Sequence, residues 1–139
     1  MNAVPSLVAV NSARSAAVAA LAGLAVLKVV MLAALFTRTE PYPPPHFAPL
    51  FSASLALTVL AIALVATRSR WFVLAVAPIV LESLLSFGPH KLYPGESDFF
   101  AQTPAVYPAI VVGSVLIAIV IVSSRTLFHA FRADHEVAW

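Results

Sequence analysis

The stretch Trp71–Phe87, WFVLAVAPIVLESLLSF, decides the fold, because it is an apolar run that carries one acid, Glu82, inside it. Its length is compatible with a membrane-spanning helix, which needs roughly 17–25 mostly apolar residues. A charged side chain at the centre of a bilayer costs about 2.5–3.5 kcal/mol on insertion scales. The rest of the chain must therefore supply surroundings in which Glu82 is tolerated.

Three further apolar runs complete a pattern of four spans, which we predict at about 14–36, 47–66, 71–87 and 104–123. Of the 139 residues, 61% are hydrophobic and only 10% are charged, and the mean hydropathy is +0.96. A soluble domain carries about 25% charged residues, and a surface as apolar as this one would aggregate in water. The prediction is a single membrane domain over residues 1–139, an all-α, integral membrane four-helix transmembrane bundle.

The two ends of the chain are expected to differ from the spans. Residues 1–13 are mildly apolar and contain Pro5 as a helix breaker, so we expect a loose or interfacial arm. They hold no basic residue, and the apolar run that follows contains Lys28, so we expect a permanent first span and not a signal peptide. Asn11 or Ser12 is expected to cap the first helix. Residues 125–136 predict a short amphipathic C-terminal helix that lies on the membrane or continues the fourth span.

The arginines predict the orientation. The second and third spans are joined by the short turn 67–70, so they form an antiparallel hairpin, and both termini lie on the side of this turn. That side carries five arginines, whereas the other side carries only Arg38 and Lys91. By the positive-inside rule both termini are cytoplasmic, and we expect a multi-pass protein of the bacterial inner (plasma) membrane. The five arginines are Arg14, Arg68, Arg70, Arg125 and Arg132.

Lys28, in the first span, is the obvious counter-charge for Glu82. With a rise of about 1.5 Å per residue, Lys28 lies about 12 Å and Glu82 about 8 Å below the outer ends of their spans. A lysine stem can reach upward by several ångströms, so the two charged groups can meet. Three interpretations stay open: an ion pair that holds the first span against the third, a working acid that moves protons or binds a ligand, and separate charges that reach towards the lipid surface.

Two other residues share a helical face with Glu82. Pro78 precedes it by four residues and Ser86 follows it by four. Proline removes a helical hydrogen bond and often kinks a helix, so Pro78 is expected to open a small polar cavity or to fit the helix into a crowded bundle. We therefore take Glu82, Lys28, Pro78 and Ser86 as the candidate site, whether it binds a ligand or is purely structural.

Further patterns indicate where helices meet. Ala19 with Gly23, and Ala109 with Gly113, are small-xxx-small pairs, which mark helix–helix contacts in membranes. A stripe of hydroxyls on the second span is expected to bond to its own helix or to a neighbouring one. These hydroxyls belong to Ser52, Ser54 and Thr58.

Several classes of site are disfavoured. The chain has no cysteine and no phosphate-binding glycine motif, and nothing indicates nucleic-acid binding. No span contains a histidine, so a bis-histidine haem within the bundle is excluded, and we expect no cofactor. His46 and His90 lie on the same outer side as Glu40, Glu96 and Asp98. They are a weak candidate for a metal site, but their spacing is not local.

The plan of four short spans, a tight basic turn after the second and longer outer loops is similar in outline to the DoxX-like proteins and to the emopamil-binding and sigma-2-receptor type bundles. The resemblance covers topology only and implies no site residue. Two functions stay open. One is a small non-catalytic multi-pass subunit or accessory protein in a larger membrane complex, and the other is a self-contained bundle that binds or converts a lipid, sterol or quinone-like molecule near Glu82. Expected partners are the lipid bilayer and other membrane subunits or further copies of the chain.

Overall fold

A computed structural model describes residues 5–92 and 104–137, and within these residues the regular structure is all helical. Four long helices are connected by turns and short 3-10 helices. The long helices are α1 (Leu7–Thr37), α2 (Ala48–Ala66), α3 (Phe72–Phe87) and α4 (Tyr107–Val137). The 3-10 helices are η1 (Pro45–Phe47), η2 (Pro89–Leu92) and η4 (Pro104–Val106).

Four helical segments in the described part of the chain are long and apolar enough to cross a membrane, by length and composition. This confirms the predicted all-helical class and fits a multi-pass membrane protein. Within the most apolar window of each segment, only 28–44% of the residues are buried inside the bundle. Most of the apolar side chains therefore point outward, as they do when lipid or another membrane helix is the surrounding medium.

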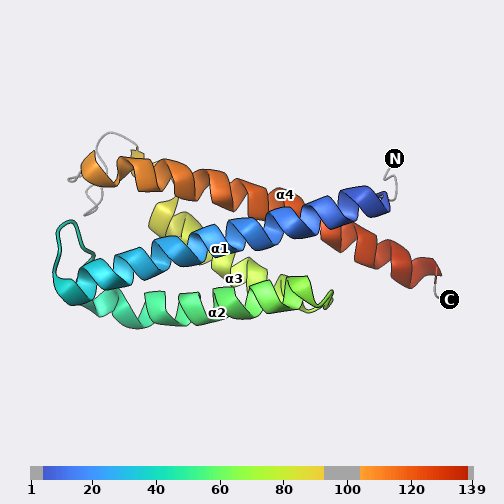
Figure 1. Ribbon diagram of the computed structural model, residues 1–139, viewed down its shortest axis with the longest axis horizontal. Helices are drawn as coiled ribbons and strands as arrows, with labels where there is room; N and C mark the ends of the chain where they lie inside the picture. The colour runs from blue at the N-terminus through green and yellow to red at the C-terminus, as the bar shows by residue number, and fades with distance from the viewer. Residues whose placement is uncertain (1–4, 93–103, 138–139) are drawn as a thin grey trace.

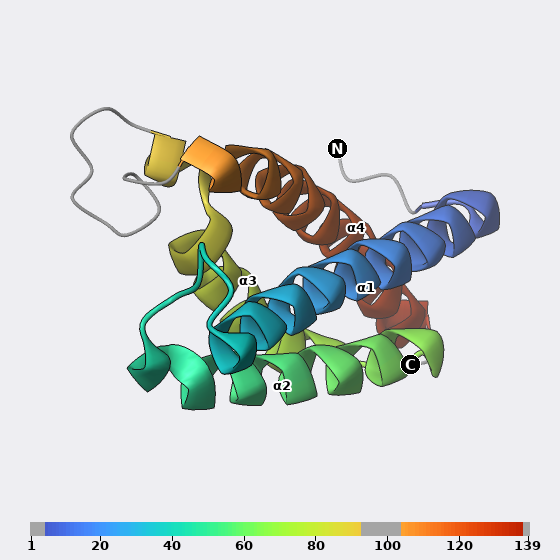
Figure 2. The same cartoon turned by 60° about the vertical axis from the view of Figure 1, so that its left-hand side comes forward.

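The helices form a bundle in which α1 and α3 each pack against both α2 and α4 (Figures 1 and 2). The start of α1, the end of α4 and the turn between α2 and α3 lie towards one end of the bundle, whereas the α1–α2 connection lies at the other (Figure 1). We call the first of these the terminal end. Since α1 and α3 lie across the bundle from each other, a contact between them must cross its interior.

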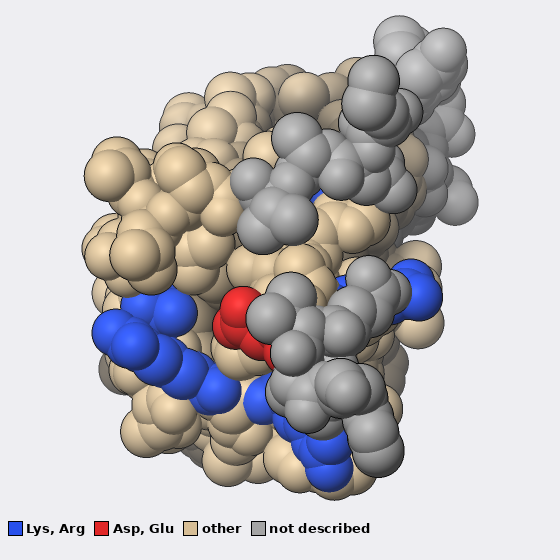
Figure 3. Space-filling model, turned by 90° about the vertical axis from the view of Figure 1, so that its right-hand side faces the viewer, with Lys and Arg blue, Asp and Glu red and all other residues tan. Residues whose placement is uncertain are grey.

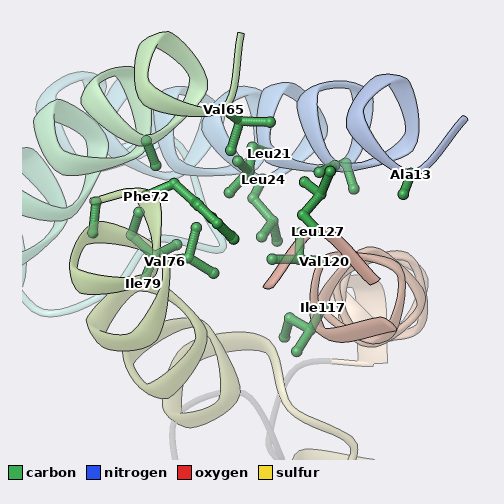
Figure 4. Packing of buried hydrophobic residues seen from close by; sticks show 14 residues of the cluster. Ala13, Leu21, Leu24, Val65, Phe72, Val76, Ile79, Ile117, Val120 and Leu127 are labelled. Atoms are coloured by element: carbon green, nitrogen blue, oxygen red, sulfur yellow. The ribbon is translucent and has the colours of Figure 1, made fainter. Parts of the chain in front are cut away.

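The main apolar core lies between all four helices. Ala17 and Leu24 of α1, Phe72 of α3 and Leu127 of α4 are at most 2% exposed. Figure 4 shows these helices converging around Leu24, Phe72 and Leu127. Alanine-rich stretches of α1 allow close helix approach, which is how helices gain packing energy when lipid removes the hydrophobic driving force between them.

The start of α1 differs from the sequence-based expectation. The helix begins at Leu7, and Ser6 is its cap, with Ser6 Oγ accepting a hydrogen bond from the backbone N–H of Ala9 at 3.2 Å. The expectation of a loose arm is therefore wrong over residues 7–13, and so is the expected cap at Asn11 or Ser12, whereas residues 1–4 lie outside the described residues. Asn11 sits within the helix, and its side chain accepts a hydrogen bond from Arg14 one turn later, at 3.0 Å. That bond occupies the oxygen that would otherwise compete for backbone N–H groups.

Helix α4 runs without interruption through the segment expected to be a tail helix at 125–136. Leu127 belongs to the core, and the ring centroids of Phe131 and Phe72 are 5.8 Å apart. The second half of α4 is thus packed against the start of α3. Helices α2 and α3 each begin one residue after the spans expected from Phe47 and Trp71, and they end at the expected residues, Ala66 and Phe87.

The far end of α3 is joined closely to α4. Gly113 is buried, and a Cβ atom placed on it would lie 2.6 Å from Cβ of Phe87. Next to it, Ser114 Oγ lies 3.1 Å from the carbonyl oxygen of Phe87 and 2.8 Å from that of Ile110. The Ser114 hydroxyl donates to the Phe87 carbonyl, which lies at the end of α3 and has no intrahelical partner.

Gly113→Ala should destabilise the bundle by about 1–3 kcal/mol, because Cβ of Phe87 can move only together with its backbone. Gly23→Ala is the matched control. Its added Cβ would meet the methyl ends of Leu116 at 2.8 and 3.1 Å, and a leucine side chain can rotate away. Thermal unfolding of both variants in the same detergent measures the difference, and equal midpoints would contradict the rigid contact at Gly113.

Candidate functional site

The charged groups of Lys28 and Glu82 meet inside the bundle. Nζ of Lys28 lies 2.9 Å from Oε2 of Glu82, which is salt-bridge distance. Lys28 is fully buried, and the side chain of Glu82 keeps 12% of its exposure. The contact joins α1 to α3, so the lysine stem spans the interior between two helices that lie across the bundle from each other.

Lys28 belongs to the buried stripe of α1. Ala17, Leu21 and Leu24 lie on the same side of the helix and are fully buried. Consecutive members of the stripe are three or four positions apart in the sequence, which places them on one face of α1. This face carries three apolar side chains and then the ammonium group of Lys28. The position of Lys28 along this stripe directs its side chain into the interior of the bundle.

Further hydrogen bonds satisfy both charged groups. Ser54 of α2 donates to Oε2 of Glu82 at 2.6 Å, and Ser86 of α3 donates to Oε1 at 2.7 Å. Lys28 Nζ also donates to Ser83 Oγ at 3.0 Å. We call these five residues the polar cluster. Three helices meet in it, and both carboxylate oxygens and the ammonium group are engaged by side chains of the chain itself.

Two members of the polar cluster were not among the candidate site residues. Ser83 follows Glu82 directly in the sequence and belongs to the buried side of α3. Ser54 lies on α2 in the hydroxyl stripe, and it is buried, as is Thr58, whose hydroxyl donates to the Ser54 carbonyl at 2.7 Å. A serine and a threonine four residues apart in an apolar span are a usable sequence signal for an inward-facing side of the helix. The sequence does not say which helix that side contacts.

Of the other candidate residues, Ser86 is buried beside Glu82, whereas Pro78 is exposed. Helix α3 continues through Pro78. Three surface grooves between the helices have linings that include neither Pro78 nor Glu82. The polar cavity expected one turn before the acid therefore has no counterpart in these three grooves.

The histidine pair gains no support as a metal site. His46 in η1 and His90 in η2 are both exposed, and the ring of His46 lies 4.3 Å from that of Phe47. Within residues 5–92 and 104–137, no three His, Asp or Glu side chains come together in a way that could hold a metal ion. Of the three acids considered with them, Glu40 is exposed, whereas Glu96 and Asp98 lie outside the described residues.

The chemistry of the polar cluster is that of a neutralised internal pair. A buried ion pair is stable only if its remaining donors and acceptors are also satisfied, and here serine hydroxyls from two helices do this. Each oxygen of the Glu82 carboxylate accepts at least one hydrogen bond from a side chain of the bundle, and the side chain keeps 12% exposure.

Comparison of the chain with models of known protein families, with curated proteins and with solved structures finds no match. The outline resemblance to DoxX-like and emopamil-binding type bundles is thus one of topology, and no site residue is carried over from a relative. The geometry of the polar cluster has to support any functional conclusion by itself.

Lys28→Met should destabilise the protein by about 3–5 kcal/mol, because it leaves the Glu82 carboxylate in the bundle without its counter-charge. The double variant Lys28→Met with Glu82→Met should recover most of this loss, since it removes both charges and keeps apolar volume. Thermal or denaturant unfolding in detergent measures both. A double variant as unstable as the single one would show that the pair is not the source of the effect.

Proposed function

We propose that the protein is a small non-catalytic multi-pass subunit or accessory protein that packs within a larger membrane complex. The observation that carries this proposal is that Lys28, Ser54 and Ser86 engage both carboxylate oxygens of Glu82. Glu82, the acid within an apolar helix, is thereby explained as a contact that connects α3 to α1 and α2. Within residues 5–92 and 104–137, no group of three His, Asp or Glu side chains could hold a metal ion.

The outward faces of the helices support an assembly role. Large apolar side chains are exposed on every long helix, including Val59 of α2 at 57%, Leu81 of α3 at 63% and Val115 of α4 at 55%. Such faces fit lipid tails and equally fit the helices of a partner subunit or a second copy. A chain with a well-packed interior and apolar outer surfaces is suited to packing between other subunits of a complex and setting the distance between them.

The orientation that goes with this proposal has both termini in the cytoplasm, in a bacterial inner membrane. Its support is the separation of charge between the two ends of the bundle. Arg68 and Arg70 lie in the α2–α3 turn at the terminal end, and Arg125 and Arg132 lie in the half of α4 that runs towards it. Cytoplasmic loops are enriched in arginine and lysine, so this end belongs on the inner side.

Site-directed photocrosslinking tests the assembly role in the native membrane. A photoreactive diazirine side chain is placed in turn at the exposed positions Val59, Leu81 and Val115. We expect at least one of them to form an adduct with a distinct membrane polypeptide, detected as a mass increase over the 14.7 kDa chain and identified by peptide sequencing.

Ile79 is the matched internal control, because it lies two residues from Leu81 on α3 and is fully buried. The same side chain there should react only within the chain. Adducts with lipid alone at all three exposed positions, together with a native mass of one or more copies of this chain only, would overturn the accessory role.

One observation favours the alternative, a self-contained bundle that binds or converts a lipid, sterol or quinone-like molecule near Glu82. The acid keeps 12% exposure, so one side of the polar cluster is within reach of a molecule in the membrane. Under this alternative the purified protein would be a monomer or homo-oligomer that carries a bound lipid-like ligand. The same native mass measurement distinguishes the two functions.

A further inference from the structure

Helix α3 carries an apolar stripe on its outward face, which we call the α3 stripe. It consists of Leu74, Pro78, Leu81 and Leu85, which are all exposed, the three leucines at 63–68%. Consecutive members are four, three and four positions apart, which is the spacing of the seam between two helices in a left-handed supercoil. Membrane helices commonly pack in this way, at crossing angles of about 20°. The spacing of the stripe therefore fits one further helix that lies lengthwise on α3.

The α3 stripe extends over the whole length of its helix. Leu74 lies in the first turn of α3, next to the terminal end of the bundle, and Leu85 lies in the last turn. Figure 3 looks at the terminal end and shows blue basic and red acidic side chains there. A helix on the stripe would thus begin near this charged end and cross the apolar region beside α3.

Glu82 borders the stripe and has an acceptor position that no described residue uses. It follows Leu81 directly, and its side chain is 12% exposed. Oε2 accepts hydrogen bonds from Lys28 and Ser54, whereas Oε1 accepts one, from Ser86, within the described residues. Each carboxylate oxygen has two lone pairs, so Oε1 can accept one more hydrogen bond.

A second acceptor on the same face results from Pro78. Proline has no N–H group, so the carbonyl of Leu74 lacks the amide donor that a helix normally supplies four residues later. In membranes, the side chains of neighbouring helices help to satisfy carbonyls that proline leaves free. Leu74 and Glu82 are eight positions apart, which is about 12 Å along the helix axis. A helix with polar side chains about two turns apart could donate to both acceptors.

We propose that a partner subunit packs a membrane-spanning helix on the α3 stripe, and that a hydroxyl or amide side chain of this helix donates to Oε1 of Glu82. The inference rests on the proposed accessory role and adds the surface and the chemistry of the partner. A lipid acyl chain would cover the leucines but has no donor. A second copy packed in parallel, α3 against α3, would bring two Glu82 carboxylates together and offer no donor, since Ser83 and Ser86 are buried.

Photocrosslinking in the native membrane tests the proposal, with a diazirine side chain placed in turn at Leu74, Leu81 and Leu85. We expect all three positions to react with one helix of one partner polypeptide. Peptide sequencing should map the modified partner residues about seven positions apart for probes at 74 and 81, and about four apart for probes at 81 and 85, because both helices rise by about 1.5 Å per residue. A serine, threonine, asparagine or glutamine of the partner should lie within one turn of the residue modified from position 81.

Two double variants measure how much the stripe contributes. Leu81→Ala with Leu85→Ala should lower the yield of the adduct from a probe at Leu74 about tenfold, which corresponds to about 1.4 kcal/mol of binding. Val59→Ala with Leu60→Ala is the matched control on α2 and should leave this yield unchanged. All four side chains are 50–63% exposed, so both variants should fold. Replacement of the mapped hydroxyl or amide residue of the partner by alanine should also lower the yield.

The outcomes separate this inference from the accessory role. Partner adducts at Val59 or Val115 without any at the α3 stripe would overturn the inference and leave the accessory role standing. Stripe adducts with lipid, with a sterol-like or quinone-like molecule or with a second copy of the chain would also overturn it. So would a partner helix that has no hydroxyl or amide side chain opposite Leu81, or an unchanged adduct yield in Leu81→Ala with Leu85→Ala.

Discussion

The structure depends on a single constraint, which is that Glu82 lies within an apolar helix and must be neutralised inside the bundle. Lys28 supplies the charge at 2.9 Å, and Ser54 and Ser86 supply hydrogen bonds. A carboxylate without these partners would carry a desolvation cost of several kcal/mol, comparable with the whole stability of a small domain. The relative positions of α1, α2 and α3 are therefore tied to one chemical requirement.

The reach of Lys28 explains why the contact lies where it does. Helices α1 and α3 are opposite each other, and small side chains along α1 allow its neighbours to pack closely. A long flexible stem then bridges the remaining distance, with its apolar part among apolar neighbours and its charged end on the carboxylate. The pair adds directional specificity to a bundle whose other contacts are mostly non-directional. The net contribution of a buried ion pair to the free energy of unfolding is small, so fixing the relative positions of the helices is the more important role of this pair.

The two ends of the protein have different chemistry. At the end away from the termini, Gly113 and Ser114 hold α4 tightly against the end of α3. At the terminal end, arginines surround a groove with an apolar interior. The polar cluster inside the bundle and the exposed apolar side chains outside it are the features that support the proposal of an accessory role.

The sequence by itself determined the class, the four apolar segments, the α2–α3 hairpin and the two charged residues that need each other. It also placed Ser86 beside Glu82, because residues four apart share a helical face. The tertiary structure alone decided that Ser54 and Ser83 complete the polar cluster, that α1 starts at Leu7 and that Arg70 lies near Arg132. The reason is that outward-facing and core-facing side chains are equally apolar here, so periodicity does not show which way most helix faces turn. Only packing of the whole bundle sets that rotation.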